Sequence, residues 1–172
     1  MSHEEHKREA RKTIRVSVVT ASDSRGEAED ASGAFLRAAL LDAGHALVSY
    51  RVVKDEPEAI HAALSEALAG GAEAVLVNGG TGVSHRDQTY EVVAGLLEKR
   101  LDGFGELFRM LSYEQIGSAA MLSRAVAGIW HGCALFSMPG SPAAVRLAWE
   151  KLIAPELPHL LREMEKHAKW SP

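Results

Sequence analysis

The stretch of residues 74–98 constrains the fold more than any other part of this 172-residue chain. A short apolar run, residues 74–77, ends at a polar loop with glycines at positions 79, 80 and 82, and an amphipathic segment then runs from Thr89 to Glu98. This order indicates a buried strand, a loop and a helix, the arrangement in which a loop and a helix N-terminus can hold a phosphate. We call residues 79–87 the glycine loop and expect it to bind an anion.

Strand and helix patterns also alternate before the glycine loop. Residues 14–21 and 45–53 favour strands, and residues 31–43 place apolar side chains on one helical face. Pro57 suits the first turn of a further helix, which ends at a pair of glycines. Such alternation is typical of right-handed βαβ units. It predicts an α/β fold with a doubly wound, mostly parallel sheet that is flanked by helices on both faces.

The pattern loosens after the glycine loop. A short helix is expected at residues 107–113, and residues 126–136 indicate two short strands that form a small β-hairpin near His131-Gly132. Two helices should follow, one over residues 145–152 and a last one from about Leu157. We assign residues 1–13 to a flexible N-terminal tail and residues 14–172 to a single domain.

Composition excludes several classes of function. The formal net charge of −4 gives no support to nucleic-acid binding, which needs a basic stripe. Residues 1–12 lack the apolar core of a secretory signal, and no apolar run approaches the roughly 20 residues that span a bilayer. The single cysteine, Cys133, fits a reducing compartment. We therefore expect a cytoplasmic protein with neither a membrane nor a nucleic-acid partner.

Four loops follow predicted strands and should lie at one edge of the sheet, where open parallel sheets bind ligands. They are residues 22–26, 54–57, 79–87 and 139–142. In the glycine loop the backbone N–H groups can approach an anion, Thr81 and Ser84 add hydroxyl donors, and Arg86 can pair with a phosphate. The alternative is a tight turn in which Asp87 or Thr89 caps the following helix. The loop matches neither the Walker A pattern nor the dinucleotide-binding fingerprint.

Two carboxylates follow strands of the predicted sheet and could face one cleft. Asp55 comes after the second strand, and Asp87 lies in the glycine loop. Carboxylates beside a phosphate-binding loop suggest Mg²⁺, which prefers a few carboxylates together with substrate phosphates. The alternative for Asp55, which the sequence alone favours, is a cap on the helix that begins at Pro57.

Residues 78–91 resemble the Gly-Gly-Thr-Gly…Arg-Asp-x-Thr-Pro-Glu loop of the MoaB/MogA family of molybdenum cofactor biosynthesis proteins. The resemblance covers about residues 14–160, and it departs from the family at Tyr90, which replaces a proline, so the helix entry is expected to differ slightly. The Ser22-Asp23-Ser24-Arg25 form of the first loop favours the MoaB branch. Further matching segments, in the family's order, are residues 22–25, 103–106, 123–124 and 138–142.

The resemblance implies a domain that assembles as a trimer or hexamer and binds molybdopterin in a cleft made by these loops. MogA-type members adenylylate molybdopterin: its terminal phosphate attacks the α-phosphate of ATP, and pyrophosphate leaves. By their places in the motifs, Asp55 and Asp87 are implied to be catalytic, and they are also the expected Mg²⁺ ligands. With the donors named above, the expected substrate- and phosphate-binding residues are Ser22, Asp23, Gly79, Gly80, Thr81, Gly82, Ser84, Arg86, Gly140 and Ser141.

This chemistry suits the glycine loop. A phosphate nucleophile is already ionised near neutral pH, so the reaction needs alignment of two anions and neutralisation of charge rather than a strong base. We therefore expect a molybdopterin adenylyltransferase, a nucleotidyltransferase that depends on ATP and Mg²⁺ and works beside other proteins of the cofactor pathway. One alternative is a non-catalytic molybdopterin-binding or assembly protein on the same fold. Another is an unrelated phospho-ligand enzyme, such as a CinA-like nucleotide hydrolase.

Overall fold

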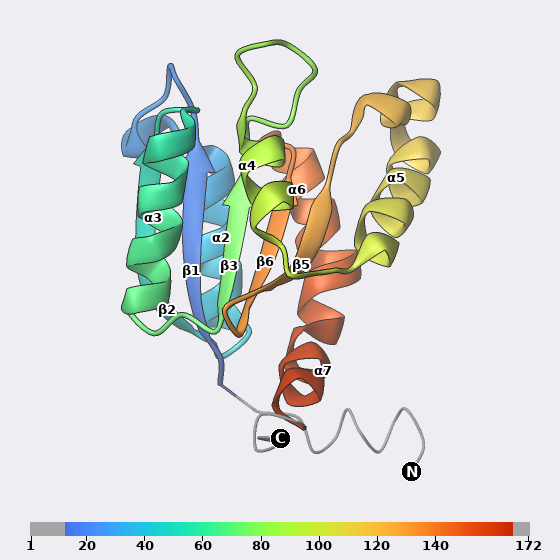
Figure 1. Cartoon of the computed structure of the whole chain (residues 1–172). Helices are drawn as coiled ribbons and strands as arrows, with labels where there is room; N and C mark the ends of the chain where they lie inside the picture. Colours follow the sequence, from blue (N-terminus) through green and yellow to red (C-terminus); the bar gives the residue numbers. More distant parts are fainter. Residues whose placement is uncertain (1–12, 167–172) are drawn as a thin grey trace.

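The protein, seen here in a computed structural model that describes residues 13–166, is built around one six-stranded sheet. The strand order is β2-β1-β3-β6-β5-β4 (Figure 1). The four strands that run parallel are β1 (Arg15–Ala21), β2 (Ala46–Val53), β3 (Ala74–Asn78) and β6 (Cys133–Met138). β5 (Val126–Trp130) is antiparallel to β6, and the two-residue β4 (Lys99–Arg100) is antiparallel to β5. The predicted mostly parallel sheet and the predicted hairpin are thus confirmed.

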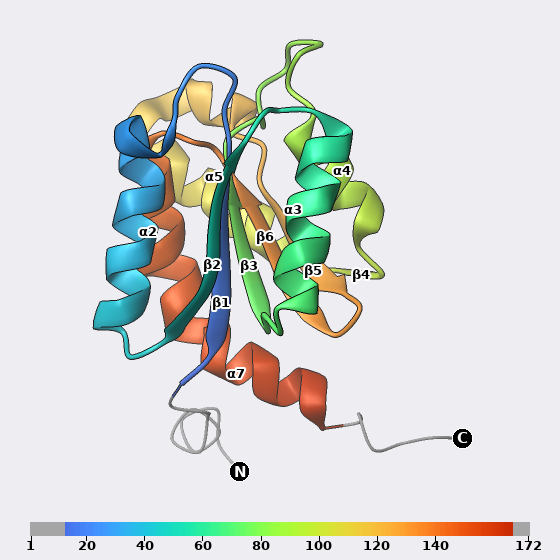
Figure 2. The same cartoon turned by 90° about the vertical axis from the view of Figure 1, so that its left-hand side faces the viewer.

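Helices cover both faces of the sheet, as predicted for a doubly wound fold. Figure 2 shows α2 and α3 on opposite sides of the strands. One face carries α2 (Ala31–Asp42), α5 (Asp102–Ile116) and α6 (Pro142–Ala148), and α7 (Ala154–Glu165) joins the same apolar cluster from one end of the sheet. The other carries α3 (Pro57–Ala69) and α4 (Thr89–Leu96). Two 3₁₀ segments, Glu27–Glu29 and Gly117–Leu122, lie outside these helices.

Each face of the sheet buries its own apolar cluster, because successive strand residues point to opposite sides. On the face of α2 and α6, Leu36 and Leu40 pack against Leu76 of β3. On the face of α3 and α4, Ile60 and Val93 pack with Val77 of the same strand. The central strands therefore carry apolar side chains on both faces, which is what a sheet covered on both sides requires.

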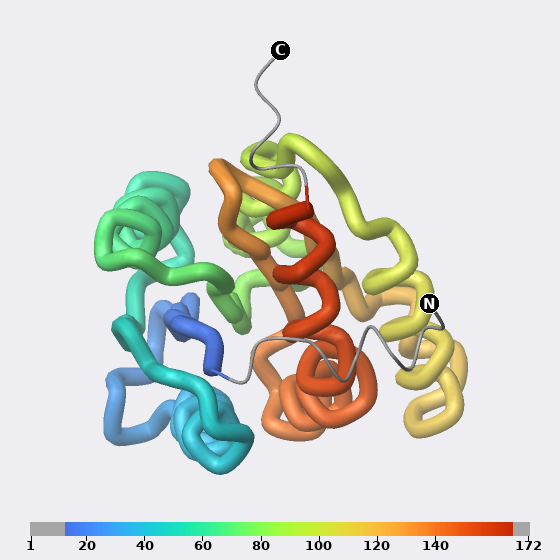
Figure 3. The backbone as a smooth tube through the Cα atoms, turned by 90° about the horizontal axis from the view of Figure 1, so that it is seen from below, coloured from blue at the N-terminus to red at the C-terminus, as the bar shows by residue number. Residues whose placement is uncertain are grey.

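The strand register places the ends of the parallel strands at one edge. Thr20 of β1 is paired with Val52 and with Asn78, and Asn78 is paired with Met138. Strand order reverses between β1 and β3, which makes this edge a topological switch point, the usual ligand position in such folds. Figure 1 shows the loop after β3 above this edge and α7 at the far end, and Figure 3 shows α7 running across that far end.

Several predicted helix boundaries were wrong. The helix predicted at residues 107–113 is α5, which begins at Asp102 and ends at Ile116. The helix continues through the glycine at position 105. A Cβ there would lie 2.5 Å from the carbonyl oxygen of Ala125, so this glycine permits close packing against the segment before β5. In addition, α4 ends at Leu96 and is followed by β4, which is too short to show a sequence period.

The last two predicted helices form one continuous helical stretch. A π-helical turn, Trp149–Ile153, joins α6 to α7, so α7 begins at Ala154 rather than near Leu157. No glycine occurs between positions 142 and 165 to stop the helix. The predicted N-terminal tail lies outside the described residues except for Thr13. No helix within residues 13–166 has the length and apolar character needed to cross a bilayer.

Candidate functional site

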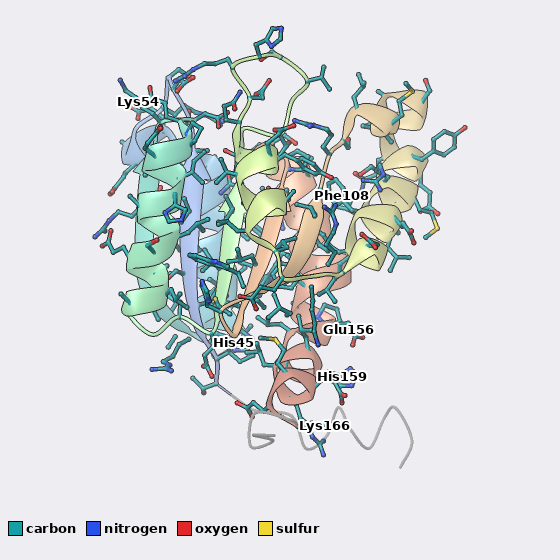
Figure 4. The ribbon with its side chains drawn as sticks, viewed as in Figure 1. His45, Lys54, Phe108, Glu156, His159 and Lys166 are labelled. Atoms are coloured by element: carbon teal, nitrogen blue, oxygen red, sulfur yellow. The ribbon has the colours of Figure 1, made fainter. Side chains whose placement is uncertain are left out.

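The four predicted loops meet at the carboxyl edge of the sheet. The N–H group of Ser22 donates to the carbonyl of Val53 at 2.8 Å, which joins the loops after β1 and β2. The N–H group of Gly79 donates to the carbonyl of Met138 at 3.1 Å, which joins the glycine loop to the loop after β6. Lys54 marks this edge in Figure 4, whereas Glu156 and His159 lie on α7 at the other end.

Two residues of the glycine loop can only be glycine. Gly79 has φ +93°, and a Cβ there would lie 2.2 Å from the carbonyl oxygen of Ala21. Gly80 has φ +61°, and its Cβ would lie 2.2 Å from the hydroxyl of Thr89 and 2.4 Å from a carboxylate oxygen of Asp55. Both conformations lie in the left-handed region that favours glycine. The glycines at positions 79 and 80 therefore bring the loop backbone against neighbouring protein groups, whereas the prediction concerned its approach to an anion.

The backbone of the glycine loop presents free donors. Among residues 13–166, no hydrogen-bond partner is found for the N–H groups of Gly80, Thr81, Gly82 or Val83. Successive unpaired N–H groups attract anions, because each carries a partial positive charge that needs an acceptor. This is the feature that makes the loop a candidate phosphate site rather than a simple turn.

Asp55 supports the start of α4, not the start of α3. Its side chain is buried, with 5% of the residue exposed. The Oδ1 atom accepts from the N–H group of Gln88 at 3.2 Å and from the hydroxyl of Thr89 at 2.8 Å. The N-cap of α3 is Glu56, which makes no side-chain capping bond. The alternative in which Asp55 caps the helix beginning at Pro57 is therefore wrong.

Asp87 stabilises the glycine loop itself. Its Oδ2 atom accepts from the N–H group of Ser84 at 3.1 Å and from the hydroxyl of Ser84 at 2.6 Å. It does not cap α4, whose N-cap is Gln88, and the hydroxyl of Thr89 is engaged by Asp55. Both capping alternatives for this loop are thus wrong. Asp55, from the loop after β2, accepts the hydrogen bonds at the start of α4 instead.

The two carboxylates lie against neighbouring parts of the glycine loop. A Cβ built on Gly80 would lie 2.4 Å from Asp55 Oδ2, and one built on Gly82 would lie 2.5 Å from Asp87 Oδ2. Within residues 13–166 there is no cluster of three or more His, Cys, Asp or Glu side chains that could hold a metal ion by themselves. Two carboxylates fit Mg²⁺ only together with phosphate oxygens, which is how this ion binds in nucleotide enzymes.

Arg86 pairs with carboxylates in this structure. Its Nε and Nη2 atoms donate to Asp23 at 2.6 and 2.7 Å, and Nη2 also donates to Glu56 at 3.2 Å. The hydrogen bonds from Arg86 hold the pKa of Asp23 below its usual range. The Asp23 carboxylate thus forms the bidentate pair with Arg86 that we expected a phosphate to form. The pair is open to water, with 54% of the Arg86 side chain and 38% of the Asp23 side chain exposed.

The remaining predicted site residues support the loops locally. The Ser22 hydroxyl oxygen accepts from the N–H group of Arg25 at 3.1 Å, and that of Ser141 caps α6 by accepting from Ala144 at 3.2 Å. The carbonyl of Gly140 accepts from the hydroxyl of Ser32 at 2.8 Å. The hydroxyls of Ser22 and Ser141 act only as acceptors in these bonds, so each keeps its O–H as a donor for a ligand.

Sequence reasoning missed Arg124, which lies just before β5. Its Nε atom donates to the carbonyl of Thr81 at 2.9 Å, and its Nη2 atom donates to that of Gly82 at 2.6 Å. It also pairs with Glu91, and its guanidinium lies 4.5 Å from the ring centroid of Tyr90. The sequence did contain a signal, because residues 123–124 and Glu91 belong to the matching segments. The sequence alone, however, assigned no role to Arg124 or to Glu91.

Tyr90 shows how the helix entry is built without the family's proline. Its N–H group donates to the carbonyl of Gly80 at 3.4 Å, a bond that proline cannot make. Its ring supplies the surface on which Arg124 lies. The expected difference in the helix entry therefore takes the form of an added tie between α4 and the glycine loop.

Comparison with known proteins was made for the sequence and for the fold. The family model described as "Probable molybdopterin binding domain" matches residues 15–159. Molybdenum cofactor biosynthesis protein B of Bacillus subtilis is 49% identical over 168 residues, which covers 96% of this chain and 99% of the relative.

Two solved structures are close to the whole fold. A crystal structure of a molybdenum cofactor biosynthesis protein B has a TM-score of 0.88 at 50% identity, with 92% of this chain and 99% of the other covered. The structure of the tungsten cofactor synthesizing protein MoaB from Pyrococcus furiosus has a TM-score of 0.86 at 40% identity, with 91% and 100% covered.

Proposed function

The chain belongs to the MoaB/MogA family of molybdenum cofactor biosynthesis proteins, and we propose that it binds molybdopterin at the glycine loop and adenylylates it with ATP and Mg²⁺. The observation that carries the proposal is the run of four free N–H groups from Gly80 to Val83, flanked by Asp55 and Asp87 at the switch point of the sheet. A terminal phosphate is an anion of the size and charge that such a loop holds.

The proposed reaction joins two phosphates. An oxygen of the pterin's terminal phosphate forms a bond to the α-phosphorus of ATP, the bond between the α-phosphorus and its bridging oxygen breaks, and pyrophosphate leaves with that oxygen. The nucleophile needs no base, because it is already ionised near neutral pH. The protein's task is to align two anions and to oppose their charge.

Different residues of the site align the two anions and oppose their charge. The N–H groups of Gly80, Thr81, Gly82 and Val83 hold the pterin's phosphate. The hydroxyl of Thr81 adds a donor, whereas the hydroxyl of Ser84 already donates to Asp87. Arg86 exchanges Asp23 for a phosphate. Ser22, Gly140 and Ser141 line the cleft beside them.

Asp55 and Asp87 suit the role of Mg²⁺ ligands. Within the described residues, Asp55 Oδ2 and Asp87 Oδ1 accept no hydrogen bond, so each carboxylate leaves one oxygen for a cation. The hydrogen bonds to the other oxygens hold each carboxylate in place. Mg²⁺ bound there would neutralise charge on the phosphates.

Turnover of purified protein with molybdopterin, ATP and Mg²⁺ tests the proposal, with pyrophosphate and adenylylated pterin as readouts. We expect Asp87→Ala to lower the rate at least a hundredfold, about 3 kcal/mol of transition-state stabilisation. Asp102→Ala is the matched control, because this aspartate is also accessible to water but lies at the start of α5 and pairs with Arg100. Wild-type protein that binds the pterin without forming product would instead make the chain a non-catalytic binding or assembly protein.

We further propose that the chain forms a trimer or hexamer through the surface of α5 and the 3₁₀ segment after it. Large apolar side chains gather there on one side of the molecule and face water, which is unusual for a monomer. They are Leu107, Met110, Tyr113, Ile116, Met121 and Leu122. Sedimentation should show the oligomer, and Met121→Glu should dissociate it. Leu41→Glu on α2, also at an exposed leucine, should not. A stable wild-type monomer would overturn this part of the proposal.

A cytoplasmic location and work beside other proteins of the cofactor pathway belong to the same proposal. Cys133 is a free, buried thiol, which suits a reducing compartment. Fractionation of cells that express a tagged chain, together with crosslinking to pathway proteins, tests both points.

A further inference from the structure

We propose that Arg124 is a positioning residue: it turns two peptide groups of the glycine loop so that their N–H groups face the ligand. The inference rests on the proposed function, because it concerns how the same loop holds the pterin's phosphate. It adds a residue from the antiparallel part of the sheet to a site otherwise built from the parallel strands.

The side chain of Arg124 makes a fork that spans two consecutive carbonyls. Nε donates to the Thr81 carbonyl at 2.9 Å and Nη2 to the Gly82 carbonyl at 2.6 Å. A guanidinium holds its donors in one rigid plane, so both bonds form only when the two carbonyls point the same way. The side chain is largely buried, with 26% of it exposed. The loop backbone is therefore held from one side.

Peptide geometry turns this anchor into an orientation of donors. A trans peptide group is planar, and its C=O and N–H bonds point in opposite directions. The described chain has no cis peptide bond. The Thr81 carbonyl shares its peptide group with the N–H of Gly82, and the Gly82 carbonyl shares its own with the N–H of Val83. Both carbonyls point at Arg124, so both N–H groups point away from it, and neither has a partner among residues 13–166.

The first turn of α4 fixes the guanidinium. Glu91 pairs with Nη1, and its second oxygen accepts from Nη2 at 3.2 Å. The ring of Tyr90 covers one face of the guanidinium at 4.5 Å from the ring centroid. The hydrogen bond from Arg124 also lowers the pKa of Glu91, so this carboxylate stays ionised near neutral pH. Because Glu91 balances the charge of Arg124, its effect on the ligand comes from geometry rather than from direct attraction.

Equilibrium dialysis of molybdopterin without ATP tests the inference separately from turnover. We expect Arg124→Ala to raise the dissociation constant at least tenfold. Arg146→Ala is the matched control, since Arg146 also lies over a ring, that of Phe35, and pairs with Glu150, but belongs to the last turn of α6. It should bind within twofold of wild type. Arg124→Ala that binds as wild type does would overturn the inference.

A conservative variant separates geometry from charge. Arg124→Lys keeps the positive charge, but a single ammonium cannot span both carbonyls in one plane. We expect the urea midpoint of unfolding of Arg124→Lys to equal that of wild type. Its affinity for molybdopterin should nevertheless be at least threefold lower. Full wild-type affinity in Arg124→Lys would show that charge alone suffices, and the fork would then be irrelevant.

Backbone amide spectra of ¹⁵N-labelled protein read the peptide orientation directly, whether or not the ligand binds. The amide chemical shifts of Gly82 and Val83 should change in Arg124→Ala and remain unchanged in Arg146→Ala. If wild type binds no molybdopterin, the proposed function fails, yet these two resonances still decide the positioning role. Unchanged resonances in a folded Arg124→Ala would overturn it.

Discussion

Asp55 offers the sharpest separation of structural from chemical roles. Its Oδ1 atom accepts from the Gln88 N–H group and from the Thr89 hydroxyl at the first turn of α4, across two loops of the site. Its charge is also the feature proposed to hold Mg²⁺. Asp55→Ala removes both the acceptor and the charge, whereas Asp55→Asn removes the charge and keeps an acceptor oxygen. The two variants should therefore fail in different ways.

The structure sets the size of the effect on stability. Thr89 is fully buried, so Asp55→Ala leaves its hydroxyl without an acceptor and the helix without its cap. Loss of a cap costs about 1 kcal/mol, and a buried unpaired hydroxyl costs about 1–3 kcal/mol. We expect Asp55→Ala to lower the free energy of unfolding by about 2–4 kcal/mol. With a urea slope of about 2 kcal/mol/M, the midpoint falls by about 1–2 M. Asp55→Asn should lose less than about 1 kcal/mol.

Urea unfolding followed by the fluorescence of the buried Trp130 and Trp149 measures stability, and the adenylylation assay measures activity. Asp55→Asn should be nearly as stable as wild type and at least a hundredfold slower. Thr89→Val, which removes the hydroxyl donor at nearly constant volume, should lower stability less in the Asp55→Ala background than in wild type. The capping argument is refuted if the urea midpoint of Asp55→Ala equals that of wild type. Full activity in a folded Asp55→Asn would refute the proposed metal-binding role.

Three further perturbations test other parts of the structure. Gly79→Ala puts a Cβ 2.2 Å from a backbone carbonyl at φ +93° and should cost at least about 2 kcal/mol in urea unfolding, whereas Gly95→Ala, with open space around it, should be neutral or stabilising. Tyr50→Phe removes a 2.7 Å hydrogen bond to the buried Asp30 carboxylate and should cost about 1.5–3 kcal/mol by the same measure. Burial lowers the pKa of His45 below the ordinary histidine value of about 6.5, so the unfolded chain takes up a proton there first. Stability in urea unfolding should therefore fall as the pH drops from 7.5 to 5.5, and less so in His45→Gln.

The elements that the sequence predicted correctly are those with local signals. Apolar runs that end in turn residues marked β1, β2 and β3, and a proline at the first turn marked α3. The glycine loop was recognisable because the backbone conformations at Gly79 and Gly80 admit almost no other residue. A local signal of this kind survives whatever the rest of the chain does, because it arises from the steric limits of a single residue.

The capping role of Asp55 shows where local reasoning ends. A carboxylate just before a proline at the first turn of a helix is a sound candidate for the cap of that helix. In the structure the same side chain serves α4, because the parallel register of β1, β2 and β3 brings the loop after β2 beside the glycine loop. Which of two helix starts receives one acceptor depends on tertiary placement. No spacing along the chain encodes it.

Arg124 was missed for a related reason, which concerns strand direction. In a parallel sheet the search for ligand residues runs through the segments that follow strands, because those segments share one edge. β5 runs against β6, so the segment that precedes β5 reaches this same edge. Arg124 stands there and contacts the glycine loop from the side opposite to the free N–H groups. In a mixed sheet, the segments that follow parallel strands and the segments that precede antiparallel strands therefore meet at one edge, and both can contribute residues to the site.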